Sequence, residues 1–118
     1  MPFDGTNYDT HVSNPVTELL EQAWAMIDKP QKWTRGQPES VDGRRLCSLN
    51  ALHTATTSRA DFRNPFPSHI IAMVILAKAM GRSGPAMPSA IASFNDCHSH
   101  REVAAAWQRA IAMSRTMP

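Results

Sequence analysis

The sequence lacks most of the features that assign a small protein to a class. None of its apolar runs approaches the roughly 20 residues that a membrane-spanning helix needs, and low-complexity tracts and internal repeats are missing from its 118 residues. The stretch from Met1 to Asp4 has neither a basic start nor an apolar run, so we expect a cytoplasmic protein with no signal peptide and no membrane association. There are only two cysteines, and in that compartment we expect reduced thiols.

Signatures of catalysis and nucleotide binding are missing as well. The sequence contains no Walker loop, no Gly-x-Gly-x-x-Gly, no Gly-x-Ser-x-Gly and no His-Glu-x-x-His. A net charge of +2 is too small to indicate nucleic-acid binding by itself. These absences identify no reaction, and they favour a protein that is not an enzyme and holds no cofactor.

The charges present are unevenly distributed. Residues 1–28 carry five acidic side chains and no Lys or Arg, whereas residues 29–63 carry seven basic and three acidic side chains. We expect the acidic first helix to pack beside the basic section. The alternative is that the basic 29–63 segment forms a nucleic-acid surface.

The hydrophobic pattern predicts an all-α fold: one small domain of about four helices, with an irregular loop or short hairpin near residues 31–46. We expect residues 1–13 to form a loose tail and residues 14–118 to form the helical domain. The stretch from Ser68 to Gly81 is apolar almost all round, interrupted only by Lys78. A helix of this kind belongs at the centre of a fold, with neighbours on several sides.

The other helices are marked by their end signals. Asn14-Pro15 is a typical helix start, and Ser99 followed by Glu102 fits a capping box. A helix is also expected from Cys47 to about Thr57, and a short helical turn over residues 90–94. In the irregular segment, Asp42-Gly43 predicts a tight turn, with hairpin arms near residues 33–37 and 45–47.

Cysteine and histidine are concentrated at one point that could suggest a metal site. The three candidate ligands are Cys97, His98 and His100. Zinc proteins usually present such ligands as Cys-x2-Cys or His-x3-His pairs, and neither occurs here. We therefore predict no metal and keep these three residues as the alternative.

We predict that one surface carries the function. Its binding residues are Trp33, Arg35, Gly36, Arg44, Asn95 and Asp96. Trp and Arg are enriched among the residues that dominate protein interfaces. Trp33 lies in a Gly- and Pro-rich loop, where it either folds back on the core or is held out for a partner.

Several short motifs occur in a characteristic order along residues 16–113. They are Leu19-Leu20, Trp33-x-x-Gly36, Asp42-Gly43-Arg44, Cys47-x-x-x-Ala51-Leu52, Ala79-Met80-Gly81, Phe94-Asn95-Asp96 and Glu102-Val103. This order resembles an uncharacterised family of small helical proteins, a domain of unknown function, from actinobacteria and their phages. The resemblance implies a helical fold and recurrence of Trp33, Gly36, Asn95 and Asp96, and it carries no activity.

Three functions remain open at this point. The first is a small non-enzymatic interaction protein, of phage origin, that binds a host protein. The second is a nucleic-acid-associated factor that uses the basic segment, whose binding would depend steeply on salt. The third is a small hydrolase or nucleotide-binding protein with a site around Arg35 and Asp96. The sequence does not determine the oligomeric state.

Overall fold

The computed structural model describes residues 14–58, 65–81 and 87–116, in which five α-helices and no β-strand occur. The helices are α2 (Pro15–Ala25), α3 (Ser48–Thr57), α4 (Pro65–Ala79), α5 (Met87–Cys97) and α6 (His100–Arg115), with a short 3-10 helix, η1 (Pro30–Lys32), after α2. The predicted all-α class is confirmed. The predicted loose tail, residues 1–13, lies outside the described residues.

The expected number of about four helices is wrong because α5 is a full helix. The sequence predicted a short turn over residues 90–94 that ends at Asn95-Asp96, since Asn and Asp usually compete with the helix backbone for hydrogen bonds. The structure continues the helix through both residues to Cys97. Asn95 does not interrupt it because its side chain bonds to groups outside α5.

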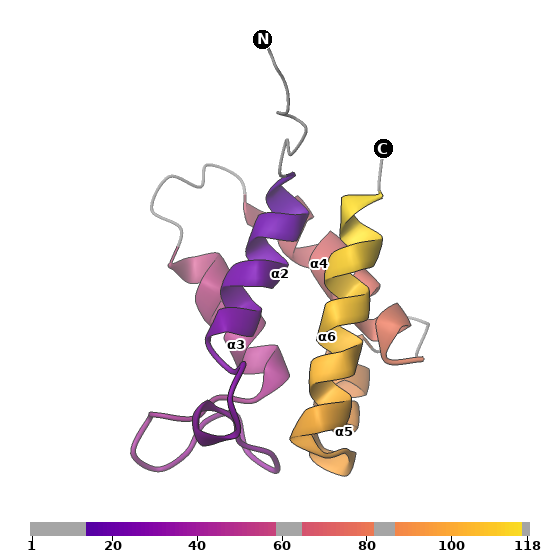
Figure 1. Ribbon diagram of the computed structural model, residues 1–118. Coiled ribbons are helices and arrows are strands. Elements are labelled where there is room, and N and C mark those ends of the chain that lie inside the picture. The colour runs from indigo at the N-terminus through magenta and orange to yellow at the C-terminus, as the bar shows by residue number, and fades with distance from the viewer. Residues whose placement is uncertain (1–13, 59–64, 82–86, 117–118) are drawn as a thin grey trace, which may run out of the picture.

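All five helices contribute to one core. In Figure 1, α2 and α6 lie side by side, and α2 also contacts α3 and α4. The fully buried side chains include Leu19, Leu20, Leu52, Leu76 and Trp107. Burying a large apolar side chain stabilises the fold by about 1.5–3 kcal/mol, so this cluster is the main source of stability.

The helix α4 is central, but one of its faces is open. Ile75 and Leu76 are buried, whereas Ile71 is 39% exposed, Val74 is half-buried and Lys78 is exposed. The prediction of neighbours on several sides is confirmed, because α4 contacts the other four helices. The described residues leave the face with spacing 71, 74 and 78 only partly covered, and an apolar run without periodicity cannot show which side this is. The helix also begins earlier than predicted, at Pro65.

Within the described residues, no helix combines the length and apolarity needed to cross a membrane.

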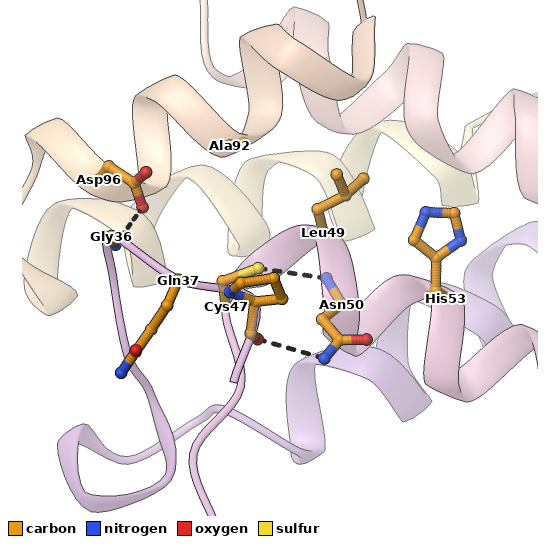
Figure 2. A pocket seen from close by; sticks show the side chains of 9 residues that line it. Gly36, Gln37, Cys47, Leu49, Asn50, His53, Ala92 and Asp96 are labelled. Carbon is orange, nitrogen blue, oxygen red and sulfur yellow. Dashed lines mark hydrogen bonds between the residues drawn. The ribbon is translucent and has the colours of Figure 1, made fainter. Parts of the chain in front are cut away.

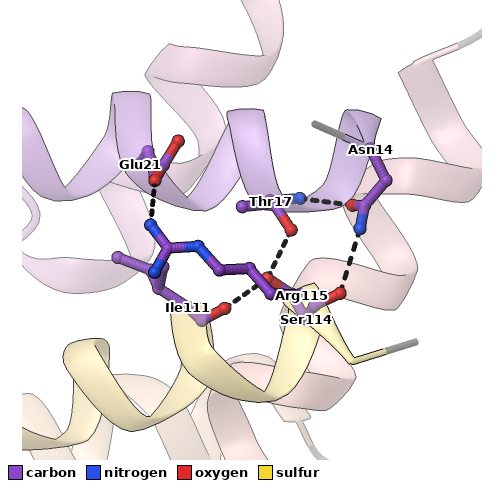
Figure 3. A network of polar contacts seen from close by, with 6 residues as sticks. All are labelled: Asn14, Thr17, Glu21, Ile111, Ser114 and Arg115. Atoms are coloured by element: carbon purple, nitrogen blue, oxygen red, sulfur yellow. Dashed lines mark hydrogen bonds and ion pairs between the residues drawn. The ribbon is translucent and has the colours of Figure 1, made fainter. Parts of the chain in front are cut away.

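A polar network joins the start of α2 to the end of α6 (Figure 3). Asn14 caps α2 by accepting the N–H of Thr17 at 2.7 Å, and its Nδ2 donates to the carbonyl oxygen of Ser114 at 3.0 Å. The hydroxyls of Thr17 and Ser114 share a hydrogen bond of 2.6 Å. We call these three residues the Asn14 clamp. On the surface beside it, Arg115 and Glu21 form an ion pair of 2.6 Å.

The segment between η1 and α3 is an irregular loop, one of the two predicted forms, and its pairing differs from that of the predicted short hairpin. Leu46 pairs in parallel with Trp33 and antiparallel with Glu39. The chain must therefore reverse between residues 33 and 39, and Gly36, with φ +82°, lies in this reversal. The predicted pairing of residues 33–37 with 45–47 in antiparallel fashion is wrong, because the antiparallel partner is the segment around residue 39. The tight turn at Gly43 is confirmed by the 2.9 Å bond from its N–H to the Ser40 carbonyl.

Candidate functional site

Trp33 and Asn95, which lie 62 positions apart, meet through hydrogen bonds. The Asn95 side chain is fully buried, and its Oδ1 accepts from Trp33 Nε1 at 2.7 Å, from Ser48 N at 3.0 Å and from Ser48 Oγ at 2.8 Å. Its Nδ2 donates to the carbonyl oxygen of Thr34 at 3.0 Å. We call Trp33, Thr34, Ser48 and Asn95 the Asn95 hub. It connects the loop after η1 to the start of α3 and to α5.

Trp33 is folded back toward the core rather than held out in solvent. The ring is half-buried and meets His100 edge-on, with 5.3 Å between ring centroids. His100 stacks on Trp24, which in turn stacks on the fully buried Trp107. The indole N–H of Trp107 donates to Ser48 Oγ at 3.0 Å, which links this stack to the hub. Trp33 is therefore placed to position the loop.

The loop is also fastened to the C-terminal end of α5. The N–H of Gly36 donates to Asp96 Oδ1 at 2.7 Å, and Asn95 Nδ2 approaches the same oxygen at 3.3 Å. Arg35 donates to the carbonyl oxygen of His98 at 3.0 Å and lies 5.9 Å from the centre of the Trp33 ring. Within the described residues, Arg35 and Asp96 form no ion pair, so the backbone of Gly36 makes the contact to the carboxylate.

An open cavity of about 380 Å³ lies between this loop, the first turns of α3 and the middle of α5 (Figure 2). We call it the groove. It is lined by Gly36, Gln37, Pro38, Cys47, Leu49, Asn50, His53, Ala92 and Asp96. Asp96 lies at one end in Figure 2 and His53 at the other. Among the described residues that line it there are one carboxylate and no Lys or Arg, so the fixed charge that they give the groove is negative.

The thiol of Cys47 lines the groove but is not activated. Cys47 is buried and caps α3, and its Sγ accepts the N–H of Asn50 at 3.3 Å. A helix N-terminus favours a thiolate. Burial, however, raises the pKa of the Cys47 thiol above its ordinary value. The neutral thiol then behaves as a small apolar wall of the groove.

Of the six predicted binding residues, five come together and one does not. Arg44 is exposed in the turn of the loop, where its N–H donates to Asp42 Oδ1 at 3.1 Å, and it does not line the groove. Gly36 and Asp96 line the groove directly. Trp33, Arg35 and Asn95 hold the loop that forms its edge.

The three alternative metal ligands are directed to different neighbours. His98 donates from Nδ1 to the Phe94 carbonyl at 2.8 Å, while His100 donates from Nε2 to the Ile27 carbonyl at 2.7 Å. Cys97 is an exposed free thiol. In the described parts of the chain, no group of three or more His, Cys, Asp or Glu side chains is arranged to hold a metal ion.

Sequence reasoning missed most of the groove lining. Cys47, the N-cap of α3, is followed at a spacing of three by Asn50 and His53, so the three residues lie on one side of the helix. Ala92 lies one turn before Asp96 on α5. Those spacings were visible in the sequence. The sequence did not show the contact that brings Pro38 to these residues. This contact is a 3.2 Å bond from Asn50 Nδ2 to the Pro38 carbonyl oxygen.

Comparison with known proteins adds one result. No curated protein and no solved structure matches the chain significantly. The model of one family, described as a family of unknown function, matches residues 11–113, which is most of the chain. This match confirms that the chain resembles an uncharacterised family. The chain therefore belongs to DUF6197, a family of unknown function.

Proposed function

We propose that this protein is a non-enzymatic interaction protein whose groove receives an extended segment of a partner protein. The observation that carries the proposal is the groove itself, with apolar walls from Pro38, Leu49 and Ala92 and a single carboxylate at one end. Binding sites commonly combine apolar walls with a few fixed polar groups. The exposed residues 35–38 at its edge provide further contact surface for a macromolecule.

The groups around the groove favour binding over catalysis. Covalent catalysis needs an activated nucleophile, and burial instead raises the pKa of the Cys47 thiol. A phosphate site needs cationic groups or free backbone N–H groups. No Lys or Arg lines the groove in the part of the chain that the structure describes, and the Arg35 guanidinium already bonds to His98. The hydrolase or nucleotide-binding alternative therefore has less support.

The nucleic-acid alternative has less support as well. Lys32 donates to Asp28 Oδ1 and to the Ala25 carbonyl, both at 2.9 Å, so its charge is partly used within the protein. Arg35 is likewise bonded within the protein, to His98. Two further basic residues of the 29–63 segment, Arg59 and Arg63, lie outside the described residues.

The test compares a groove-filling variant with a matched surface variant. Ala92→Phe places a large ring in the groove, and Ala105→Phe makes the same change at an exposed position of α6. Each protein captures partners from an actinobacterial lysate, the host that the family resemblance suggests, in low and moderate salt.

We expect a protein partner that survives moderate salt with the wild type and with Ala105→Phe, and that Ala92→Phe loses. Retention of the same partner by folded Ala92→Phe would refute the groove as the binding site. Nucleic acid that is captured in low salt and lost in moderate salt would favour the second function instead.

A further inference from the structure

The charge and shape of the groove identify the group that it recognises. We infer that the groove binds a lysine side chain of the partner segment, with the ammonium group at Asp96 and the aliphatic stem along the walls. The inference rests on the proposed function, and it names the chemistry of the occupant.

The carboxylate of Asp96 is oriented before any ligand arrives. Its Oδ1 accepts from Gly36 N at 2.7 Å and faces Asn95 Nδ2 at 3.3 Å. Its Oδ2 has no hydrogen-bond partner among the described residues. Because the loop and α5 already hold one oxygen, a cation gains an ion pair without having to order the side chain.

This arrangement suits an ammonium group better than a guanidinium group. Arginine gains most from a carboxylate when its two parallel N–H groups bond to both oxygens. Here Oδ1 of Asp96 is already occupied by Gly36 and Asn95. A lysine ammonium is a compact point charge that can bond to one oxygen, so the single available oxygen, Oδ2, matches it.

The rest of the groove suits the stem of a lysine. Pro38, Leu49 and Ala92 present apolar surface, and the buried thiol of Cys47 adds a neutral wall. Lysine side chains commonly lay their methylene groups on such surface and keep the charge at its edge. An anionic group would be repelled by Asp96, and an apolar group would cover the carboxylate without a partner, which costs free energy.

The test uses a small probe, Nα-acetyl-lysine methylamide, with its arginine and norleucine analogues at constant ionic strength. Binding is followed by the amide NMR shifts of residues 36–38, 47–53 and 92–96. The proteins are the wild type, Asp96→Asn and the surface control Glu21→Gln. Asparagine at position 96 can still accept from Gly36 N, so the loop contact is kept while the negative charge is removed.

We expect the lysine probe to bind the wild type about threefold to fivefold more tightly than either analogue, since an ion pair at the exposed Asp96 carboxylate adds a modest gain. Asp96→Asn should remove this preference, and Glu21→Gln should keep it. Equal binding of the lysine and norleucine probes, tighter binding of the arginine probe, or no groove shifts with any probe would each overturn the inference.

The two proposals fail in different ways. If Asp96→Asn retains the captured partner and Ala92→Phe loses it, the lysine inference is wrong and the binding groove stands. If folded Ala92→Phe also retains the partner, the proposed function itself is wrong.

Discussion

Two small polar networks hold distant parts of this chain together, and they differ in what they join. The Asn14 clamp connects two helix ends, through the hydroxyls of Thr17 and Ser114 at 2.6 Å (Figure 3). The Asn95 hub connects a loop to two helices, and one oxygen of Asn95 accepts three hydrogen bonds. Each network has two buried members, Thr17 and Ser114 in the clamp and Ser48 and Asn95 in the hub, and both link residues that are far apart in the sequence.

The difference shows that burial of a polar side chain does not by itself distinguish a network that joins helices from one that borders a groove. Buried polar groups are nearly always hydrogen-bonded, and the clamp satisfies this rule by joining two helices directly. The hub satisfies it beside the groove, because Asp96 follows Asn95 and binds the loop at Gly36. We therefore expect changes in the clamp to alter stability alone, and changes in the hub to alter both stability and the groove.

The largest effect is expected for Asn95→Leu. Leucine has a similar size but cannot accept the hydrogen bonds of Trp33 and Ser48, and each buried group left without a partner costs about 1–3 kcal/mol. We expect the free energy of unfolding, measured by urea denaturation, to fall by about 3–5 kcal/mol. Amide exchange in residues 33–47 should become faster than in α6. A smaller loss of unfolding free energy for Asn95→Leu than for Thr17→Val, the clamp variant described next, would contradict the expected difference between the two networks.

A smaller effect is expected for Thr17→Val in the clamp. Valine keeps the shape of threonine and removes the bond to Ser114, while Ser114 Oγ can still donate to the Ile111 carbonyl at 2.7 Å. The expected loss is about 1–2 kcal/mol in the same urea experiment. Binding of the lysine probe should equal that of the wild type. Weaker probe binding would show that the clamp affects the groove.

Two glycines offer a matched test of the loop. Gly36 and Gly81 have φ values of +82° and +77°, and a Cβ added at either one would meet no atom within 4 Å. Alanine in this backbone region costs about 1 kcal/mol at each position. Gly36→Ala should also weaken probe binding, since it strains the loop that holds Asp96, and Gly81→Ala should leave binding unchanged. Equal probe binding by the two variants would show that strain in the loop does not affect binding in the groove.

The smallest effect concerns pH and lies outside both networks. Burial lowers the pKa of His69 below its ordinary value of 6.5, and the nearby His53, at 4.8 Å between ring centroids, lowers it further. The unfolded chain then binds more protons than the folded one below about pH 6.5, so stability should be lost as the pH falls through this range. Melting temperatures from pH 8 to pH 5 test this for the wild type and His69→Gln.

The variant should show a weaker dependence between pH 6.5 and 5. The lowered pKa values of Asp28, Asp42 and Glu102 act in a lower range, because their ordinary values are 3.8, 3.8 and 4.5. Identical profiles for the wild type and His69→Gln would show that His69 does not contribute.

The sequence by itself determined the features that depend on near neighbours in the chain. The capping box of Ser99 and Glu102 and the cap at Asn14 are formed as predicted, because their hydrogen bonds span three residues. The Asp42-Gly43 turn is local in the same way. The all-α class followed from such signals together with the hydrophobic pattern.

Only the tertiary structure decided how the candidate site is built. The sequence nominated Trp33, Gly36, Asn95 and Asp96, but it did not pair them or show that Trp33 points inward. It also missed the full length of α5, the parallel pairing of Trp33 with Leu46 and the open face of α4. These features depend on hydrogen bonds and contacts between segments tens of residues apart, whose geometry exists only once the five described helices have packed.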